Sequence, residues 1–427
     1  MIKKTSNLKE WSWVPSLYFA EGLPYAFVMI VSTILYKKLD ISNTEIALYT
    51  SWLYLPWVIK PFWSPFVEIF KSKRFWIIIT QFIIGVSLAG VALTIPTSNA
   101  LRYTLAFFWL MAFSSSTHDI AADGFYMLGL STHKQSWYLG IRNSFYRLAI
   151  LFGQGIIIII AGYFETITGN LVYAWSTVFG FLSAFFFIIS IYHLRVLPFP
   201  QNDGEKSIEN TKDIFSEYFF IVRTYFKKPK IILTIFFILL YRFGEAQLVK
   251  IAPLFMLDSR SDGGLNLTTS EYGFIYGTLG VAMLTIGGII GGFFIAKHGL
   301  KFWILWMALA MKLPDLAYVY MAHAQPTNLT LISILVAIEQ LGYGFGFTAY
   351  LLYMMMISEG ENKTTHYAIC TGIMALGMMI PGMFSGAIQE SFGYVSFFYW
   401  VMISTIPGLI LIKFLSIDEK FGLNRDR

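Results

Sequence analysis

The chain has 427 residues, of which 56% are hydrophobic and only 13% are charged, and its mean hydropathy is +0.61. A typical soluble domain has about 25% charged residues, so this composition excludes an ordinary soluble protein. The formal net charge of +6 comes from basic residues in alternate loops, which indicates membrane topology rather than nucleic-acid binding. The single cysteine, Cys370, excludes an intrachain disulfide and a cysteine-ligated metal site.

The apolar segments are long enough to cross a bilayer, which takes about 20 residues of helix. Helices are expected because backbone groups in lipid must be satisfied within the segment, and apolar runs such as 156–160 exclude alternating β-strands. We predict an all-α membrane protein with twelve transmembrane helices. They lie near residues 11–36, 43–67, 75–96, 101–130, 135–162, 172–197, 230–257, 270–297, 301–322, 328–357, 364–390 and 394–416.

The first segment carries Glu21 and has no small-residue cleavage site, so we interpret it as a retained membrane helix rather than a signal peptide. Gly22 and Pro24 beside this acid loosen the helix, as in the interrupted helices of transporter sites. Lys60 near the end of the second segment either extends toward the membrane interface or meets an anionic substrate.

Ionisable residues gather in the fourth segment. Asp119 and Asp123 are four residues apart, so they share one helix face. Two such carboxylates in a low dielectric cannot both ionise cheaply, so the pair can load a proton at one membrane face and release it at the other. The alternative is neutralisation by Arg142 or Arg147 of the next helix. His118 can relay protons or can simply hydrogen-bond a neighbour.

A loop at 198–229 separates an N-terminal half, residues 1–197, from a C-terminal half, residues 230–427. The loop begins with turn chemistry and continues with aromatic residues at helical spacing. These predict an amphipathic helix that either lies on the membrane surface or packs on the bundle. Cationic residues gather in the loops on one side, so both termini are expected in the cytoplasm.

The seventh segment contains Arg242 and Glu245, which are three residues apart and can pair. Unpaired, Arg242 would hold a carboxylate or phosphate of the substrate; paired, it is a gate or a structural bridge. The tenth segment contains Glu339 and Gln340. For Lys312 and Asp315 in the ninth segment we expect a local ion pair.

Small residues in the eighth and eleventh segments permit close helix approach. Gly287, Gly291 and Gly382 belong to these stripes, which suit either sliding or static packing. The two halves also share a weak repeat, because Lys134 to Tyr138 and Lys363 to Tyr367 open corresponding helices. Two six-helix repeats are the arrangement of major facilitator transporters, in which the first, fourth, seventh and tenth helices line the central cavity.

Several motifs are missing from the sequence. There is no Gly-x-x-x-x-Gly-Lys-Ser/Thr phosphate loop and no His-Glu-x-x-His motif. We therefore expect no cofactor and no metal, and we do not expect an enzyme.

The chain resembles the AmpG-like muropeptide permeases, a branch of the major facilitator superfamily. The resemblance spans nearly the whole chain, and each motif is modest by itself. The matching stretches are Gly22-Leu-Pro24, Lys60-Pro-Phe-Trp-Ser-Pro-Phe-Val-Glu68, Asp119-Ile-Ala-Ala-Asp123, Tyr146-Arg147-Leu148, Phe243-Gly-Glu-Ala246, Glu339-Gln-Leu-Gly-Tyr-Gly-Phe-Gly346 and Pro407-Gly-Leu-Ile-Leu411.

The resemblance implies import of N-acetylglucosaminyl-1,6-anhydro-N-acetylmuramyl peptides into the cytoplasm, driven by the proton gradient, for cell-wall recycling. Relatives also carry acetyl-CoA or siderophores, so family alone does not decide the substrate. The chain departs from the family pattern where Glu68 replaces an aspartate and Ile69 an arginine, in the cytoplasmic gating stretch that ends at Arg74.

The sequence thus predicts a proton-coupled importer of anionic amino-sugar compounds that acts as a monomer in the bacterial inner membrane. Glu21, His118, Asp119, Asp123 and Glu339 are the proton-coupling candidates. The substrate-binding candidates are Arg147, Arg242, Glu245, Lys60 and Gln340. The alternatives are the same machine carrying a siderophore, a simple sugar or an acyl-CoA, or else a membrane enzyme or a sensor.

Overall fold

The computed structural model describes residues 8–200, 203, 211–360 and 362–423, and every element in this part of the chain is helical. The chain divides into two compact units. Unit 1 comprises Met1–Ser32 and Phe62–Phe215, and unit 2 comprises Thr33–Pro61 and Ser216–Arg427. The boundaries fall within or beside three helices, which are α3 (Ser32–Lys38), α5 (Leu55–Ile69) and α11 (Thr211–Phe226).

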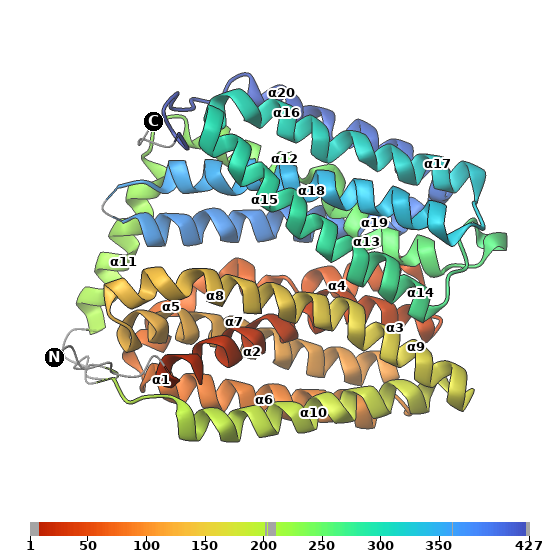
Figure 1. Ribbon diagram of the computed structural model, residues 1–427, viewed down its shortest axis with the longest axis horizontal. Coiled ribbons are helices and arrows are strands. Elements are labelled where there is room, and N and C mark those ends of the chain that lie inside the picture. Colours follow the sequence, from red (N-terminus) through yellow and green to blue (C-terminus); the bar gives the residue numbers. More distant parts are fainter. Residues whose placement is uncertain (1–7, 201–202, 204–210, 361, 424–427) are drawn as a thin grey trace. The chain divides into compact units, whose positions relative to one another are not determined.

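Unit 1 is built around α6, which packs against both α7 and α10, while α2 packs against α8. Figure 1 shows α6 and α10 side by side along their length. The elements are α1 (Leu8–Trp11), α2 (Val14–Ala26), the π-helix η1 (Phe27–Val31), α6 (Lys73–Thr94), α7 (Ala100–Gly129), α8 (Thr132–Leu151), the π-helix η2 (Phe152–Ile156), α9 (Ile157–Thr168) and α10 (Leu171–Val196).

The close packing of α2 on α8 depends on Gly22. A Cβ atom at this position would lie 2.9 Å from Ala149 Cβ and 2.9 Å from the Tyr146 carbonyl oxygen. Only a glycine therefore lets the two backbones approach this closely. The approach holds the neighbouring Glu21 inside the bundle, where its side chain is 6% exposed.

Unit 2 is built around α18, which packs against both α15 and α16, while α19 packs against α13 and α4. The elements are α4 (Asn43–Trp52), α12 (Ile231–Tyr241), α13 (Phe243–Leu257), the 3-10 helix η4 (Arg260–Asp262), α14 (Thr269–Tyr272), the π-helix η5 (Gly273–Gly280), α15 (Val281–His298), α16 (Leu300–Lys312), the 3-10 helix η6 (Leu313–Asp315), α17 (Leu316–Ala324), α18 (Leu329–Ser358), α19 (Lys363–Ser404) and α20 (Ile406–Ile412).

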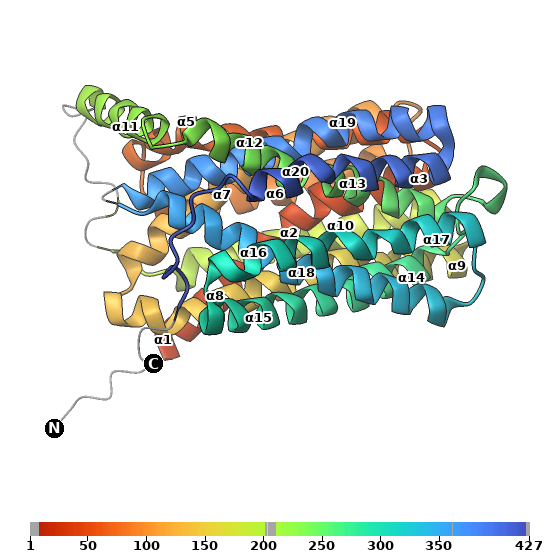
Figure 2. The same cartoon turned by 90° about the horizontal axis from the view of Figure 1, so that it is seen from above.

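The long helix α19 is broken at Gly393, whose φ of 75° and ψ of 167° are not helical. This residue lies between the two apolar segments expected at 364–390 and 394–416. Figure 2 shows the chain turning back between the main run of α19 and α20. Glycine tolerates the positive φ without a Cβ clash, so the break allows one helical stretch to supply two membrane passes.

Nine helices in the described ranges are long and apolar enough to cross a membrane. The α4–α5 region and α7 do not meet these criteria; α7 carries Arg102 at one end and a polar stretch from Ser114 to Asp123. The nine are Val14–Lys38, Lys73–Thr94, Trp137–Thr168, Leu171–Val196, Ile231–Leu257, Thr269–His298, Leu300–Ala324, Leu329–Ser358 and Thr365–Ile412.

Helix α11 occupies the region in which the sequence predicts an amphipathic helix. Tyr225 near its end is fully buried in the core of unit 2, and its hydroxyl lies 3.3 Å from Cys370 Sγ. Phe219, Phe220 and Phe226 are exposed. The end of α11 therefore packs on the bundle and also presents an aromatic surface.

Candidate functional site

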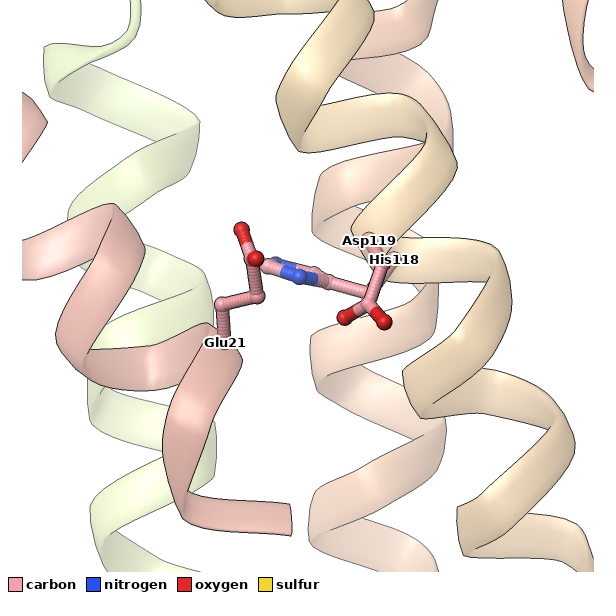
Figure 3. Close-up of side chains that lie close together, drawn as sticks. All are labelled: Glu21, His118 and Asp119. Carbon is pink, nitrogen blue, oxygen red and sulfur yellow. The ribbon is translucent and has the colours of Figure 1, made fainter. Parts of the chain in front are cut away.

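Unit 1 contains a cluster of a histidine and two carboxylates. Glu21 comes from α2, and His118 and Asp119 come from α7. One ligand atom from each side chain lies within 4.8 Å of the others, and Figure 3 shows the His118 imidazole extending toward the Glu21 carboxylate. His118 is 1% exposed and Asp119 is half-buried. We call Glu21 and Asp119 the carboxylate pair.

A hydrogen-bonded chain leads from this cluster through the bundle. His118 Nε2 lies 2.9 Å from Nε2 of Gln81 in α6. The Gln81 Oε1 atom lies 2.9 Å from Nδ1 of His193 in α10, whose Nε2 lies 3.0 Å from Oγ of Ser16 in α2. We call Ser16, His193, Gln81 and His118 the amide–imidazole chain. It joins α2, α10, α6 and α7 through buried or half-buried groups.

The orientation of Gln81 decides what the cluster can bind. Its amide nitrogen can only donate, so His118 Nε2 accepts and the neutral ring carries its hydrogen on Nδ1. Nδ1 has no hydrogen-bond partner within the described residues. With a hydrogen there, the ring offers the carboxylate pair a donor rather than a lone pair. In this orientation the cluster suits a proton better than a metal ion, which needs the lone pair.

Asp123 lies one turn after Asp119 but has a different neighbour. Its Oδ1 lies 2.5 Å from Nη2 of Arg142 in α8, close enough for an ion pair but not aligned as a hydrogen bond. The Arg142 guanidinium also lies 4.4 Å from the centre of the Tyr18 ring and 5.4 Å from that of Tyr126. The sequence left open that Arg142 or Arg147 neutralises the two aspartates, and the structure shows Arg142 paired with Asp123.

Arg147, the other arginine of α8 considered for this role, is exposed. It makes no hydrogen bond or ion pair with another residue in the described ranges. The two arginines are five residues apart, so they point in different directions from the same helix.

In unit 2 the arginine and glutamate of α13 form a buried pair. Arg242 Nη2 lies 3.4 Å from Oε1 of Glu245, and their side chains are 8% and 5% exposed. The guanidinium also donates to the Tyr343 hydroxyl and lies 4.8 Å from the centre of the Phe347 ring. Its Nε is buried and has no partner among the described residues. Arg242 is therefore paired on one side and retains one unused donor.

Glu339, the acid predicted in the tenth segment, belongs to a second buried cluster of polar side chains in unit 2. Glu339 Oε2 accepts from Gln340 Nε2 at 3.0 Å and from the Tyr318 hydroxyl at 3.4 Å. Lys312 donates to the Tyr241 carbonyl oxygen at 2.5 Å. It forms no ion pair within 4 Å in the described part of the chain, so the expected local pair of Lys312 with Asp315 is absent there, because the ammonium turns to the end of α12.

Two lysines of unit 2 are further cationic groups, and only one of them, Lys60, is a predicted site residue. Lys250, which the sequence did not single out, is 4% exposed; its ammonium donates to Thr50 Oγ1 at 2.8 Å and lies 5.5 Å from the centre of the Tyr54 ring. No carboxylate within the described residues lies at ion-pair distance from it. Lys60, which the sequence did single out, is half-buried in α5.

Residues predicted for gating or packing have separate contacts. Arg74 donates to the Leu197 carbonyl oxygen at 3.3 Å and lies 3.9 Å from the centre of the Phe199 ring, so it ties α6 to the end of α10. A Cβ on Gly287 would lie 2.1 Å from the Leu341 carbonyl oxygen, and one on Gly291 would lie 2.9 Å from that of Phe345. A Cβ on Gly382 would lie 2.6 Å from Ser51 Oγ. The Glu68 side chain lies outside the described residues.

A further polar network in unit 2 joins α4 to the C-terminal helices. Asn43 Nδ2 lies 3.1 Å from Asp258 Oδ2, 2.7 Å from Gln389 Oε1 and 3.0 Å from the Tyr394 hydroxyl. Lys37 donates to Asn43 Oδ1 at 2.9 Å and also pairs with Asp258. The sequence analysis missed this network because its members lie in three stretches, at 37–43, 258 and 389–394, that are more than 100 residues apart along the chain.

The amide–imidazole chain was also missed apart from His118. The signal was available, because Gln81 is a lone amide within the apolar run from Phe75 to Val86, and polar side chains inside membrane helices are costly and usually functional. His193 lies near the end of its apolar segment, where it reads as an interface residue. Only the packing of α10 on α6 brings it to Gln81.

The model of the Major Facilitator Superfamily matches residues 16–263, which is more than half of the chain. A Rickettsia conorii protein that carries the name AmpG 4 is 23% identical over 418 residues, covering 94% of this chain and 95% of that protein. The Escherichia coli K12 anhydromuropeptide permease is 23% identical over 403 residues, covering 93% of this chain and 77% of its own length.

Solved structures share the fold at low sequence identity. The crystal structure of the nucleoside transporter NupG has a TM-score of 0.71 at 13% identity, covering 96% of this chain and 100% of that chain. The D-xylose-proton symporter has a TM-score of 0.69 at 13% identity, covering 98% and 99%. The chain belongs to the Major Facilitator Superfamily and is a multi-pass membrane transporter of all-α fold that resembles the AmpG-type permeases.

Proposed function

We propose that the protein is a proton-coupled importer of anionic amino-sugar compounds, and that its substrate is an anhydro-muropeptide. The observation that carries the proposal is the presence of buried ionisable groups within apolar helices of both units. Glu21 and His118 in unit 1 are 6% and 1% exposed, and Arg242, Glu245 and Glu339 in unit 2 are 7%, 4% and 3% exposed. Such groups in membrane helices mark substrate or proton pathways.

The proton part of the proposal rests on the carboxylate pair. Its oxygens lie within 4.8 Å of each other in a largely buried setting. Two negative charges at that separation repel strongly when water is excluded, so binding one proton relieves the repulsion. The pair and His118 then titrate as a set rather than singly. Asp123 lies outside this cluster and forms an ion pair with Arg142 instead.

The substrate part rests on cations that retain donors for an anionic cargo. Arg147 is exposed, Arg242 has a buried Nε without a partner in the described residues, and Lys250 lacks a carboxylate there. Arginine suits bidentate binding of carboxylates. The names of the curated relatives, among them the E. coli anhydromuropeptide permease, support a muropeptide as the cargo. Glu245, Lys60 and Gln340 remain candidates for contacts with its polar groups.

We place the protein in the bacterial cytoplasmic membrane as a monomer with both termini in the cytoplasm. The basic residues of alternate loops support this orientation. Transport would follow from alternating access, in which one six-helix half moves against the other around the bound substrate.

The test is uptake of a labelled N-acetylglucosaminyl-1,6-anhydro-N-acetylmuramyl peptide into proteoliposomes that contain the purified protein. We expect accumulation when the outside is more acidic than the inside, and loss of accumulation when a protonophore collapses the gradient. An Asp119→Asn, Asp123→Asn double variant should lose accumulation, whereas Asp262→Asn, which changes an exposed acid of η4, should retain it.

Each part of the proposal can fail separately. Uptake that is unaffected by collapse of the pH gradient would contradict proton coupling. Absence of muropeptide uptake together with uptake of a siderophore, a simple sugar or an acyl-CoA would contradict the substrate. A competition series of these compounds in a thermal-shift assay ranks them on the same protein preparation, because a ligand that binds the folded state raises its melting temperature.

A further inference from the structure

The amide–imidazole chain has a direction, because each of its links has one donor and one acceptor. When the Ser16 hydroxyl donates to His193 Nε2, the His193 ring carries its hydrogen on Nδ1 and donates to Gln81 Oε1. The Gln81 amide nitrogen then donates to His118 Nε2. The hydrogen of His118 is left on Nδ1. Every donor therefore points the same way, from Ser16 toward the carboxylate pair.

This direction suits an ionised carboxylate pair. A hydrogen on His118 Nδ1 can be donated to a carboxylate oxygen, which only accepts when it is charged. Hydrogen bonds that follow one another in a single direction also polarise and strengthen each other. In this direction the amide–imidazole chain favours the state in which the pair carries no proton, because only that state can accept the Nδ1 hydrogen, which has no partner among the described residues.

A protonated carboxyl needs an acceptor on His118, whereas an ionised carboxylate needs a donor. The carboxyl O–H donates, so His118 Nδ1 must become an acceptor and the ring hydrogen must sit on Nε2. Gln81 then has to present Oε1 to His118 and its amide nitrogen to His193. Rotation of the amide group by half a turn achieves this without moving the helix, since the oxygen and nitrogen are nearly the same size. In the His193 ring the N–H bond at Nδ1 breaks and one forms at Nε2, which faces Ser16, so the ring loses one proton and gains one.

Ser16, at the far end of the amide–imidazole chain, can satisfy either direction of hydrogen-bond donation. The Ser16 hydroxyl oxygen lies 3.0 Å from His193 Nε2, 3.2 Å from the Trp13 carbonyl oxygen and 3.3 Å from the Ser12 carbonyl oxygen. It can donate to the imidazole in one direction, or accept from it while donating to the backbone of α2 in the other. Both arrangements therefore satisfy every group in the chain.

We propose that proton binding to the carboxylate pair reverses the amide–imidazole chain, so that His118 and His193 change tautomer together through rotation of the Gln81 amide. Each imidazole carries one hydrogen in both states, and the only proton gained overall is the one on the carboxyl. Gln81, His193 and Ser16 are thus positioning residues that act through His118. The inference rests on the proposed proton coupling and identifies the groups that respond to the proton.

The other titratable groups around the carboxylate pair come from α2, α7 and α8. They are the phenols of Tyr18, Tyr25 and Tyr146 and the ion pair of Asp123 with Arg142. None of them lies in the path from His118 to Ser16. The α6 and α10 helices contribute Gln81 and His193, which belong to the chain itself.

The consequence is that one proton alters hydrogen bonds on four helices. The pair binds the proton between α2 and α7, and the response reaches α6, α10 and the first turn of α2 at Ser16. The chain is therefore a two-state element whose equilibrium the proton biases, which is the physical requirement for coupling a bound proton to a change of conformation.

The test is nitrogen NMR of the full-length protein, labelled with 15N in its histidines and held in lipid bilayers, over a pH titration. The 15N shifts distinguish a bare from a protonated ring nitrogen, and His118→Gln and His193→Gln variants assign the signals. We expect both imidazoles to change from the Nδ1–H to the Nε2–H form at one shared midpoint as the pH falls. In a Glu21→Gln, Asp119→Asn variant neither should change at that midpoint.

Gln81→Leu should uncouple the two rings, so that His193 no longer follows His118. Gln81→Met keeps the length of the side chain and serves if the leucine variant does not fold. Gln247→Leu is the matched control, because it removes a buried glutamine in unit 2 that bonds Phe243 and Trp400, and the shared transition should persist. Separate midpoints in the unchanged protein, a fixed His193 tautomer, or doubly protonated rings would each overturn the proposal.

The two proposals fail in different ways. The NMR titration needs no transport, so a concerted change of tautomer in a protein whose uptake ignores the pH gradient would contradict proton coupling alone. Proton-driven uptake with a His193 ring that does not follow His118 would contradict the chain reversal alone.

Discussion

Arg142 in α8 forms an ion pair with Asp123, whereas Asp119, one turn earlier on α7, lies with Glu21 and His118. Two aspartates on one helix face therefore belong to different electrostatic environments. Asp123 lies 2.5 Å from a guanidinium nitrogen of Arg142. The carboxyl of Asp119 shares its surroundings with another acid and a histidine, which is the setting expected of a proton carrier.

We predict that Asp119→Asn abolishes uptake driven by the pH gradient and leaves exchange of internal for external substrate, since exchange needs no release of the proton. Asp123→Asn should retain a larger share of the driven uptake. It should lower the stability by only about 1 kcal/mol, because the paired side chains of Arg142 and Asp123 are 25% and 42% exposed. Proteoliposome uptake, counterflow and thermal unfolding measure the three quantities. Equal loss of driven uptake in both variants would contradict the distinction.

Because Arg242 and Glu245 form a buried pair, we predict that the effects of substituting them on the free energy of unfolding are strongly non-additive. Glu245→Leu should destabilise the protein by roughly 3–5 kcal/mol, because it leaves a buried guanidinium without its carboxylate. Adding Arg242→Met to Glu245→Leu removes the unpaired charge and should recover most of the lost stability. A double-mutant cycle of chemical unfolding in detergent measures the coupling. Additive effects of the two substitutions would show that the pair contributes no interaction.

The glycines of α15 offer a test of packing with an internal control. Gly287→Ala should destabilise by about 1–3 kcal/mol, because its Cβ would lie 2.1 Å from the Leu341 carbonyl oxygen of α18. Gly292→Ala on the same helix has nothing within 4 Å of the new atom. It should be neutral or stabilising by up to about 1 kcal/mol, from helix propensity alone. Thermal unfolding of the purified variants compares them directly.

Lys250 predicts opposite effects on binding and on stability. Lys250→Met should raise KM for an anionic substrate about tenfold or more, since a hydrogen bond to a charged group contributes roughly 1.5–3 kcal/mol. It should raise the melting temperature, because a buried ammonium without a carboxylate is costly. Lys297→Met, which changes an exposed lysine at the end of α15, is the control. An unchanged KM would exclude Lys250 from the binding site.

The Asn43 network predicts local opening of α4. Asn43→Leu leaves buried acceptors of Asp258 and Gln389 with fewer donors, at a cost of roughly 1–3 kcal/mol. Hydrogen exchange should then rise in residues 43–52 and remain unchanged in α6. Thr44→Val removes the one exposed hydrogen bond of the Thr44 hydroxyl to Glu390 and should change exchange far less. Equal exchange in the two variants would show that the network does not hold α4 in place.

Helix identity and the presence of buried charge could be predicted from the sequence because both are local properties. Apolar runs of about 20 residues determine a membrane helix whatever surrounds them. An acid within such a run, such as Glu21 or Glu339, is recognised without its partners. Gly393 likewise breaks α19 between two predicted segments, since the positive φ belongs to the residue itself.

Only the tertiary structure decided which polar residues form hydrogen bonds and ion pairs with one another. Asp119 and Asp123 look alike in sequence, and the rotation of α8 decides which of them meets Arg142. Gln81 and His193 are 112 residues apart, and their contact exists because α6 and α10 pack side by side. Hydrogen bonds and ion pairs require atoms within about 3–4 Å, which no spacing along the chain encodes between different helices. The sequence therefore determined which residues carry charge in the membrane, and the packing of the helices decided which of them meet, as Asp123 meets Arg142 and Glu21 lies with His118 and Asp119.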